Sequence, residues 1–385
     1  MFERLVGKIK KIKKLREYEK NGIKCVEAET TVFPICGIPG KKIPKDIKRK
    51  KVFKRIFIFP YEPSVNDEIV LTEEESLLFL KDHKEESLIK ENEFLKIETF
   101  KGLGARIGKL IYKPKNTNLF NLYGDIQAKG WVLKGGILDV VSFDNYLQLW
   151  DASYKKVYGF LEYKKHGIIL RKKIKIVKDL PLFILQLAVS VKKKRKVELG
   201  EYVMVNAFST GYEHIIYYLS NQGIEYERYH KPLSPWYQTK SISCYKTGGV
   251  LYFNENKKIS FMLLTEPENL ETVEWMPSHN GPEIAFLFKR VEIKKEKRYN
   301  LLIALGENFH LDKNSMTIIS RYGEKTIFLT RSILPVKSGF FESKGRKHPV
   351  KFEELNIKGV GRIYKGLSQT YDKTASSCLK GLTYA

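Results

Sequence analysis

The chain has 385 residues, 43% of them hydrophobic and 14 of them proline, a composition that excludes a disordered or proline-rich linker protein. This length predicts two or more packed units rather than one core. A formal net charge of +25 at pH 7 attracts polyanions, so nucleic acid is the first candidate partner.

Residues 1–60 form a basic N-terminal segment with 18 basic and 6 acidic side chains. The pattern predicts a helix to about Lys20, followed by strands at 23–32 and 56–60. Residues 61–100 reverse the balance, with 4 basic and 12 acidic side chains. This acidic stretch either docks against the basic segment or lines a face that repels nucleic acid.

Residues 61–195 are expected to form a helix followed by a β-meander. Thr72 and Glu75 have the spacing of a capping box and predict a helix that runs to roughly residue 91. Alternating apolar and polar residues from there to 177 predict antiparallel strands joined by short turns. The apolar run at 180–191 could form a buried helix.

Residues 196–240 are predicted to be a connecting β-α-β unit. A strand precedes Thr210 and Glu213, whose spacing is that of a second capping box. The helix that they begin is expected to end at Gly223, and a strand follows it.

Residues 241–385 are predicted to be a β-rich C-terminal domain with glycine- and lysine-rich loops and a short helix at 369–382. Its strands are expected at 249–254, 260–265, 283–291 and 326–330. For the whole chain these patterns predict the α+β class: antiparallel β-rich meanders with a few helices and one β-α-β unit, in at least two domains.

Three charged residues in the central meander have a recognisable spacing. Asp139 lies in the apolar segment GGILDVV, and Glu162 and Lys164 follow in the segment LEYK. From Asp139 to Gln186 the sequence resembles the core of the PD-(D/E)XK nuclease superfamily. The resemblance implies that Asp139 and Glu162 are the catalytic ligands of a Mg²⁺ ion and that Lys164 positions the attacking water. It also implies that Gln186 corresponds to a glutamine that lies on a helix in some branches of the superfamily.

This region departs from the superfamily pattern in two respects, because an extra strand is predicted at 147–150 and no preceding helix supplies a further acidic residue close to the core. The E-x-K spacing also recurs at Glu292 and Glu342 in this Lys- and Glu-rich chain. The alternative interpretation of Glu162 and Lys164 is therefore a solvated charged pair on an exposed strand face.

Cations are concentrated in the same region, with twelve basic residues and one acidic residue between 164 and 196. Arg171, Lys173 and Lys175 alternate along a predicted strand and so share one face, where they can follow successive phosphates. A basic face that serves only solubility is the alternative. The residues expected here to contact nucleic acid are Lys164, Lys165, Arg171, Lys173, Lys175, Lys192, Lys194 and Arg195.

Two glycine-rich segments, residues 101–109 (KGLGARIGK) and 358–366 (KGVGRIYKG), are further candidates for phosphate binding. Neither has the Walker spacing, so nucleotide hydrolysis is not predicted. Glycine lets backbone N–H groups approach a phosphate while the flanking cations add charge, although ordinary tight turns have the same composition. The phosphate-binding residues expected in these segments are Lys101, Arg106, Lys109, Lys358 and Arg362.

Cysteine spacing and hydropathy limit the cofactors and compartments to be expected. Four cysteines without a C-x-x-C spacing exclude a zinc ribbon, and we expect no cofactor unless the chain is a nuclease that binds Mg²⁺. The apolar run at 180–191 is shorter than the ~20 residues that cross a bilayer. We therefore expect no membrane partner and a cytoplasmic (intracellular) location, or a virion if the chain is viral. The lysine-rich, glutamine-poor composition is typical of thermophile proteins.

These observations favour a nucleic-acid-binding protein that holds the phosphate backbone with little sequence specificity. RNA, DNA and a hybrid duplex all remain possible ligands, and other protein subunits are expected partners in a nucleoprotein complex, such as a guide-directed defence complex. The chain is more simply interpreted as non-catalytic. The alternatives are a Mg²⁺-dependent nuclease of the PD-(D/E)XK type and a structural virion or scaffold protein.

Overall fold

The structure is a computed structural model in which secondary structure is almost entirely strand. It describes residues 6–20, 23–35, 53–59, 62–70, 87–101, 104–120, 127–128, 131–132, 136–143, 146–148, 154–204, 214–220, 222–229, 240–242, 247–254, 257–276, 283–343, 346–355, 357–369 and 378–384. Helical structure in these residues is limited to short 3₁₀ turns such as η2 (Lys113–Lys115) and η3 (Pro267–Asn269). No helix in this part of the chain is long and apolar enough to span a membrane.

The predicted α+β class is therefore wrong, and the described chain is all-β with antiparallel sheets. The segment predicted as an N-terminal helix is strand β1 (Val6–Lys20). Its cations face a neighbouring strand that carries Glu27 and Glu29 opposite Arg16 and Lys13, and such cross-strand pairs of opposite charge stabilise a sheet.

The other predicted helices are strands as well. The apolar run at 180–191 is β16 (Leu182–Val191), which lies inside a sheet with apolar residues on both faces. The predicted β-α-β unit is a β-hairpin of β18 (His214–Leu219) and β19 (Ile224–Tyr229). The C-terminal helix is replaced in its described part by β33 (Cys378–Tyr384), and the helix predicted to reach residue 91 by β5 (Ser87–Glu91).

Both predicted capping boxes, Thr72 with Glu75 and Thr210 with Glu213, lie outside the described residues. The extra strand predicted at 147–150 corresponds to β12 (Tyr146–Gln148), and the strand predicted at 249–254 is β21 (Gly249–Asn254).

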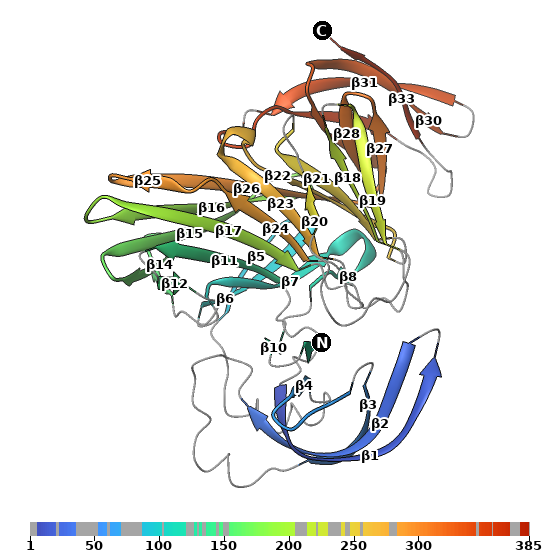
Figure 1. The fold of residues 1–385 in the computed structure, drawn as a ribbon. Helices are drawn as coiled ribbons and strands as arrows, with labels where there is room; N and C mark the ends of the chain where they lie inside the picture. Colours follow the sequence, from blue (N-terminus) through green and yellow to red (C-terminus); the bar gives the residue numbers. More distant parts are fainter. Residues whose placement is uncertain are drawn as a thin grey trace.

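The N-terminal strands form a small sheet of their own, with the order β3-β2-β1-β4. Figure 1 shows it at the bottom of the molecule, apart from the larger sheets. Its remaining strands are β2 (Ile23–Ile35), β3 (Phe53–Phe59) and β4 (Glu68–Val70). A short hairpin of β9 (Gln127–Ala128) and β10 (Trp131–Val132) lies next to β4.

Two large antiparallel sheets make up the centre of the molecule (Figure 1). The eleven-stranded sheet contains β5, β6 (Leu95–Phe100), β7 (Arg106–Tyr112), β8 (Thr117–Asn118), β11 (Gly136–Phe143), β12, β17 (Arg195–Met204), β20 (Lys240–Ile242), β23 (Leu270–Met276), β24 (Glu283–Phe288) and β25 (Val291–Ile293). The nine-stranded sheet contains β13 (Lys155–Val157), β14 (Phe160–Lys165), β15 (Ile168–Ile176), β16, β26 (Glu296–Gly306), β22 (Ile259–Leu264), β21, β18 and β19.

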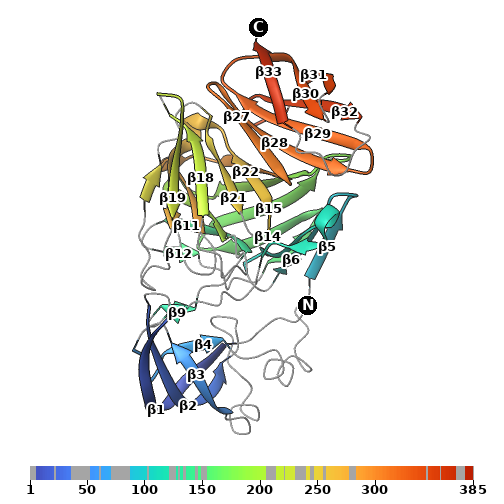
Figure 2. The same ribbon diagram turned by 90° about the vertical axis from the view of Figure 1, so that its right-hand side faces the viewer.

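A seven-stranded sheet covers part of the far face of the nine-stranded sheet, at the top of Figure 2. Gly306 of β26 lies directly against Ile318 of this sheet, too close for a side chain at that position. The strands of the seven-stranded sheet are β27 (Asn308–Asp312), β28 (Ser315–Tyr322), β29 (Lys325–Ser332), β32 (Ile363–Gln369), β31 (Arg346–Leu355), β30 (Val336–Ser343) and β33.

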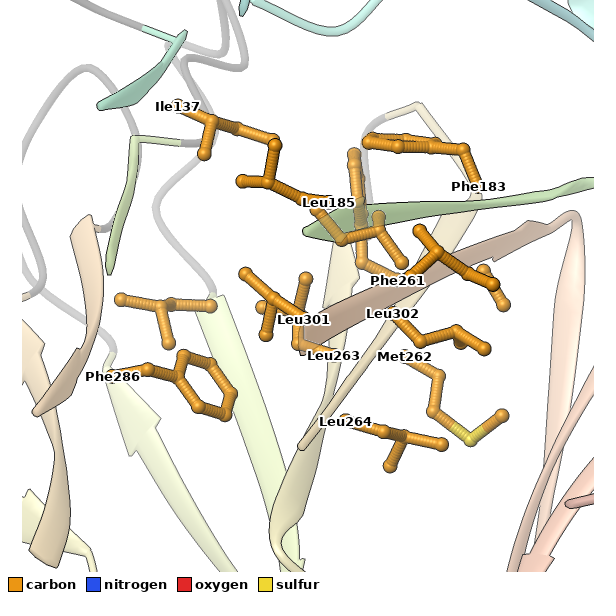
Figure 3. Packing of buried hydrophobic residues seen from close by; sticks show 14 of the residues in the cluster. Ile137, Phe183, Leu185, Phe261, Met262, Leu263, Leu264, Phe286, Leu301 and Leu302 are labelled. Atoms are coloured by element: carbon orange, nitrogen blue, oxygen red, sulfur yellow. The ribbon is translucent and has the colours of Figure 1, made fainter. Parts of the chain in front are cut away.

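The main hydrophobic core lies on both faces of the nine-stranded sheet. Its inner face carries Leu185, Leu263 and Leu301, which share one side by register and pack with Ile137 and Phe286 of the eleven-stranded sheet (Figure 3). The opposite side of the same strands carries a second apolar set, Met262, Leu264 and Leu302, which joins Met316 and Ile318 of β28 in the seven-stranded sheet. The outer face of β14–β16 lies beyond this cover and carries polar residues.

Candidate nucleic-acid interface

The two carboxylates of the nuclease-like motif lie on different sheets. Asp139 belongs to β11, and Glu162 belongs to β14. Along β14 and β15, Glu162 is paired with Arg171 and Leu161 with Lys172, so Glu162 and Lys172 point to opposite faces. Lys172 points inward, where its Nζ donates to Asp139 Oδ1 at 2.7 Å. The structure therefore does not bring Asp139 and Glu162 around one metal ion.

Each of these carboxylates is neutralised by a cation of the chain itself. Glu162 is 6% exposed and accepts hydrogen bonds from Lys164 Nζ and Arg171 Nε, both at 2.7 Å, which lowers its pKa. Within the described ranges no group of three His, Cys, Asp or Glu side chains is placed to hold a metal. Gln186, expected on a helix, lies on strand β16 and donates to Asn300 Oδ1 at 3.0 Å.

The outer face of β14, β15, β16 and β26 is a polar surface built from three rows of side chains. Register places Lys164, Ile169, Ser190 and Glu296 in the first row, Glu162, Arg171, Ala188 and Arg298 in the second, and Lys173, Gln186 and Asn300 in the third. Arg171, Lys173 and Lys175 share this face as predicted, because the alternate residues of β15 are buried. We call these rows, together with Lys175, the outer face.

Three turns at one end of the outer face add further cations, and we call them the basic turns. They are the turns at 165–167, 192–194 and 294–295, which project to the left in Figure 1. The Lys192 N–H donates to the Gly167 carbonyl at 3.0 Å, and the Val191 N–H to the Lys295 carbonyl at 2.9 Å. Arg195 joins them, since its Nη1 donates to the His166 carbonyl at 2.9 Å.

The segments that form this end of the molecule are strongly cationic. Residues 162–167, 190–198 and 290–298 together hold twelve Lys and Arg against four Glu. Some of the cations are paired: Lys194 with Glu292 at 2.8 Å and Arg298 with Glu296 at 2.7 Å. Lys192, Lys193, Lys294 and Lys295 are exposed and form no ion pair in the described structure. The charge of these four lysines is therefore available to an anionic partner.

The second glycine-rich segment lies beside the outer face. A side chain at Gly359, whose φ is +78°, would collide with the Asn300 amide in the third row. Arg331, buried beneath the segment, donates from Nη1 to the Arg362 carbonyl at 2.7 Å, and burial lowers its pKa to about 10. Lys358 and the Arg362 side chain stay exposed. Packing thus explains the glycine, and Lys358 precedes it in the chain at the border of the outer face.

Two of the cations in the first glycine-rich segment, Arg106 and Lys109, lie on strand β7 of the eleven-stranded sheet. Arg106 is 1% exposed at the start of β7, so its guanidinium is buried and not available to a ligand phosphate. Lys109 lies 3.8 Å from Glu98 on the same sheet, and Lys101 is half-buried before Gly102 and Leu103, which lie outside the described residues. The burial of Arg106 therefore counts against its predicted contact with a ligand phosphate.

Sequence reasoning missed the part of this interface that comes from residues 290–298. Lys294 and Lys295 lie about a hundred residues after the alternating cations Arg171, Lys173 and Lys175, and they come near them only because β26 pairs with β16. Their signal in the sequence is the segment VEIKKEKR, an apolar strand followed at once by a cationic turn. The strand pairing that brings this turn near Arg171, Lys173 and Lys175 cannot be recognised from either sequence segment alone.

Comparisons with known proteins give no family. No protein-family model matches the sequence, and no curated protein matches it. Among solved structures, an aldose epimerase homologue from C. elegans aligns with 60% of this chain and 100% of its own, at 9% identity and a TM-score of 0.43. A TPR-domain containing protein from Parabacteroides distasonis aligns with 60% of this chain and 48% of its own, at 9% identity and a TM-score of 0.41.

A 4-alpha-glucanotransferase from Thermococcus litoralis aligns with 60% of this chain and 41% of its own, at 12% identity and a TM-score of 0.35. These values are too low to support a conclusion about this chain. The function is therefore argued from the residues alone.

Proposed function

We propose that the protein binds nucleic acid by its phosphate backbone, through the outer face and the basic turns. The observation that supports this most directly is the convergence of three cationic turns from separate parts of the chain at one end of the nine-stranded sheet. Each phosphate neutralised by a lysine or arginine releases condensed counterions, so a cluster of exposed lysines gives strong, salt-dependent binding without reading bases.

The geometry favours binding over cleavage. The carboxylates that a nuclease would need are separated between the inner and outer faces, and each already has a cation partner. Lys192, Lys193, Lys294 and Lys295, by contrast, form no ion pair in the described structure. A surface of this kind can hold a polyanion through its cations.

A salt titration of binding tests the proposal. The variant Lys192→Gln, Lys193→Gln, Lys294→Gln, Lys295→Gln should bind a labelled oligonucleotide more weakly, and the slope of log K against log salt should become shallower. The matched control replaces exposed lysines of the C-terminal sheet, Lys313, Lys325, Lys337 and Lys351, by glutamine and removes the same charge.

Fluorescence anisotropy across a range of salt concentrations gives both the affinity and the slope. If overall charge alone were responsible, the control would lose as much affinity as the turn variant. If the wild-type protein bound no oligonucleotide at low salt, the proposal would be overturned.

A further inference from the structure

The turn between β13 and β14 carries an aromatic residue in an unfavourable conformation. Val157 pairs with Phe160, so Tyr158 and Gly159 form a two-residue hairpin loop, with φ values of +45° and +81°. Positive φ at both positions defines a type I′ turn, in which Asn, Asp or Gly is favoured at the first position. Tyrosine in this left-handed region is strained, so turn formation alone does not explain the choice of residue.

Packing of the Tyr158 ring does not compensate for the backbone strain either. It is 98% exposed, more than any other large hydrophobic side chain among the described residues, and its ring contacts no other aromatic ring there. The next most exposed aromatics differ, since Tyr226 stacks near Tyr217 and Tyr322 near Phe94. Strained backbone positions cluster at ligand-binding sites, so the strain, more than the exposure, makes this ring a candidate for ligand contact.

Cations surround this hairpin. Lys155 and Lys156 on β13 are exposed, and Lys173 of the outer face lies 5.2 Å from the centre of the Phe160 ring. Lys90 reaches the same place from the other large sheet, because its Nζ donates to the Ile174 carbonyl at 2.6 Å. Partial burial and the nearby charges of Lys173 and Lys156 lower the pKa of Lys90, which agrees with a dense local cluster.

Lys155, Lys156, Lys173 and Lys175 form no ion pair in the described part of the chain, although Glu162 lies opposite Lys155 in the register of β13 and β14. The cluster is also continuous with the basic turns, because β14 begins at Phe160 beside Tyr158 and ends at Lys165. At ~3.3 Å per residue this strand spans roughly 20 Å, so one extended nucleic-acid strand can contact both ends.

We propose that Tyr158 is a stacking platform for an unpaired nucleobase, with Lys155 and Lys173, which share the outer side of the sheet by register, contacting the phosphates beside it. The inference rests on the proposed function and makes it more specific, because it assigns a single-stranded segment as the preferred ligand. A base that is paired within a duplex presents no free face to the ring, whereas any unpaired base does.

The test uses Tyr158→Asn, a change that removes the ring and places a favoured residue in the type I′ turn. This variant should fold at least as stably as the wild type, which separates a binding defect from a folding defect. Its affinity for a labelled single-stranded deoxythymidine oligonucleotide should fall roughly five- to 100-fold, while its affinity for a duplex of the same length should not change. Tyr158→Trp should retain single-strand binding.

The outcomes separate the two proposals. Equal single-strand affinity of the wild type and Tyr158→Asn would overturn the stacking role and leave phosphate binding by the turns in place. A loss for the duplex as large as for the single strand would also overturn it, because a stacking role predicts selectivity. If the wild type bound neither ligand, the proposed function would fall, and this inference with it.

Discussion

Lys172 and Lys173 are neighbours on β15, yet they belong to different regions of the molecule. Lys172 is 0% exposed on the inner face and pairs with Asp139, whereas Lys173 lies on the outer face without an ion pair in the described structure. The first cation holds two sheets together, and the second is available to a ligand. The comparison shows that the net charge of a chain says little about function until it is known to which face of a sheet each cationic side chain points.

The largest effect is expected from breaking the buried pair. Lys172→Met would leave the Asp139 carboxylate uncompensated between the sheets and should lower the free energy of unfolding by about 3–5 kcal/mol. Chemical denaturation measures this loss in the free energy of unfolding. Adding Asp139→Leu should restore most of the loss, because two apolar side chains of similar size can replace a buried ion pair.

The matched change on the outer face is Lys173→Met, which should alter stability by no more than about 0.5 kcal/mol. Equal stability of Lys172→Met and Lys173→Met would contradict the inner and outer assignment of β15.

The next effect concerns binding through the outer face. Lys173→Gln together with Lys175→Gln should weaken binding similarly for all sequences and lower the salt slope by about one for each phosphate that is no longer neutralised. Lys313→Gln with Lys325→Gln, exposed on the C-terminal sheet, is the control. Loss of binding to one sequence alone would show base readout instead.

A smaller effect, in the opposite direction, is expected at Glu162. Glu162→Gln keeps a hydrogen-bond acceptor but releases Lys164 and Arg171 from their carboxylate, so affinity for nucleic acid should rise roughly 1.5- to fivefold. Incubation of the wild type with labelled strands and Mg²⁺ serves as the companion measurement. Cleavage that Glu162→Gln abolishes would favour the nuclease alternative and count against the outer-face assignment.

The smallest effect is a pH dependence. The pKa of Glu162 is lowered by its bonds to Lys164 and Arg171, and the pKa of Glu296 by bonds from Ser190 and Arg298. A carboxylate with a lowered pKa stabilises the fold above its unfolded value near 4.5, and this contribution disappears as pH falls through the folded value. Stability measured by denaturation should change little on this account between pH 6 and 8 and decline below about pH 4.5, less steeply in Glu162→Gln.

Much of the strand pattern was predictable, but the strand or helix identity of apolar runs was not. Alternation along β15 predicted the shared face of Arg171, Lys173 and Lys175 because a half-buried strand has a period of two. Residues 182–191 have no such period, since β16 is covered on its inner face along its length and on part of its outer face. A continuous apolar run is equally consistent with a buried helix, so the prediction failed there.

The candidate interface could be predicted only in part, for a related reason. The alternating cations of β15 (Arg171, Lys173 and Lys175) and the cationic run at 192–196 were recognisable as local sequence patterns. The contribution of Lys294 and Lys295 depends on the pairing of β16 with β26. The strain at Tyr158 depends on a type I′ turn, which the dipeptide Tyr-Gly does not predict. Long-range pairing and backbone conformation are set by the whole fold, and one segment does not encode them.

The backbone hydrogen bonds that join the basic turns affect the entropy cost of binding a ligand. Two of these turns pass between the large sheets, from β16 to β17 and from β25 to β26, and each is bonded to a neighbouring strand or turn. Their main chains are thus fixed before any partner arrives, and only the lysine side chains lose freedom on contact. Such preorganisation reduces the entropy cost of association, so even a short strand of nucleic acid could be held without a loop first having to order.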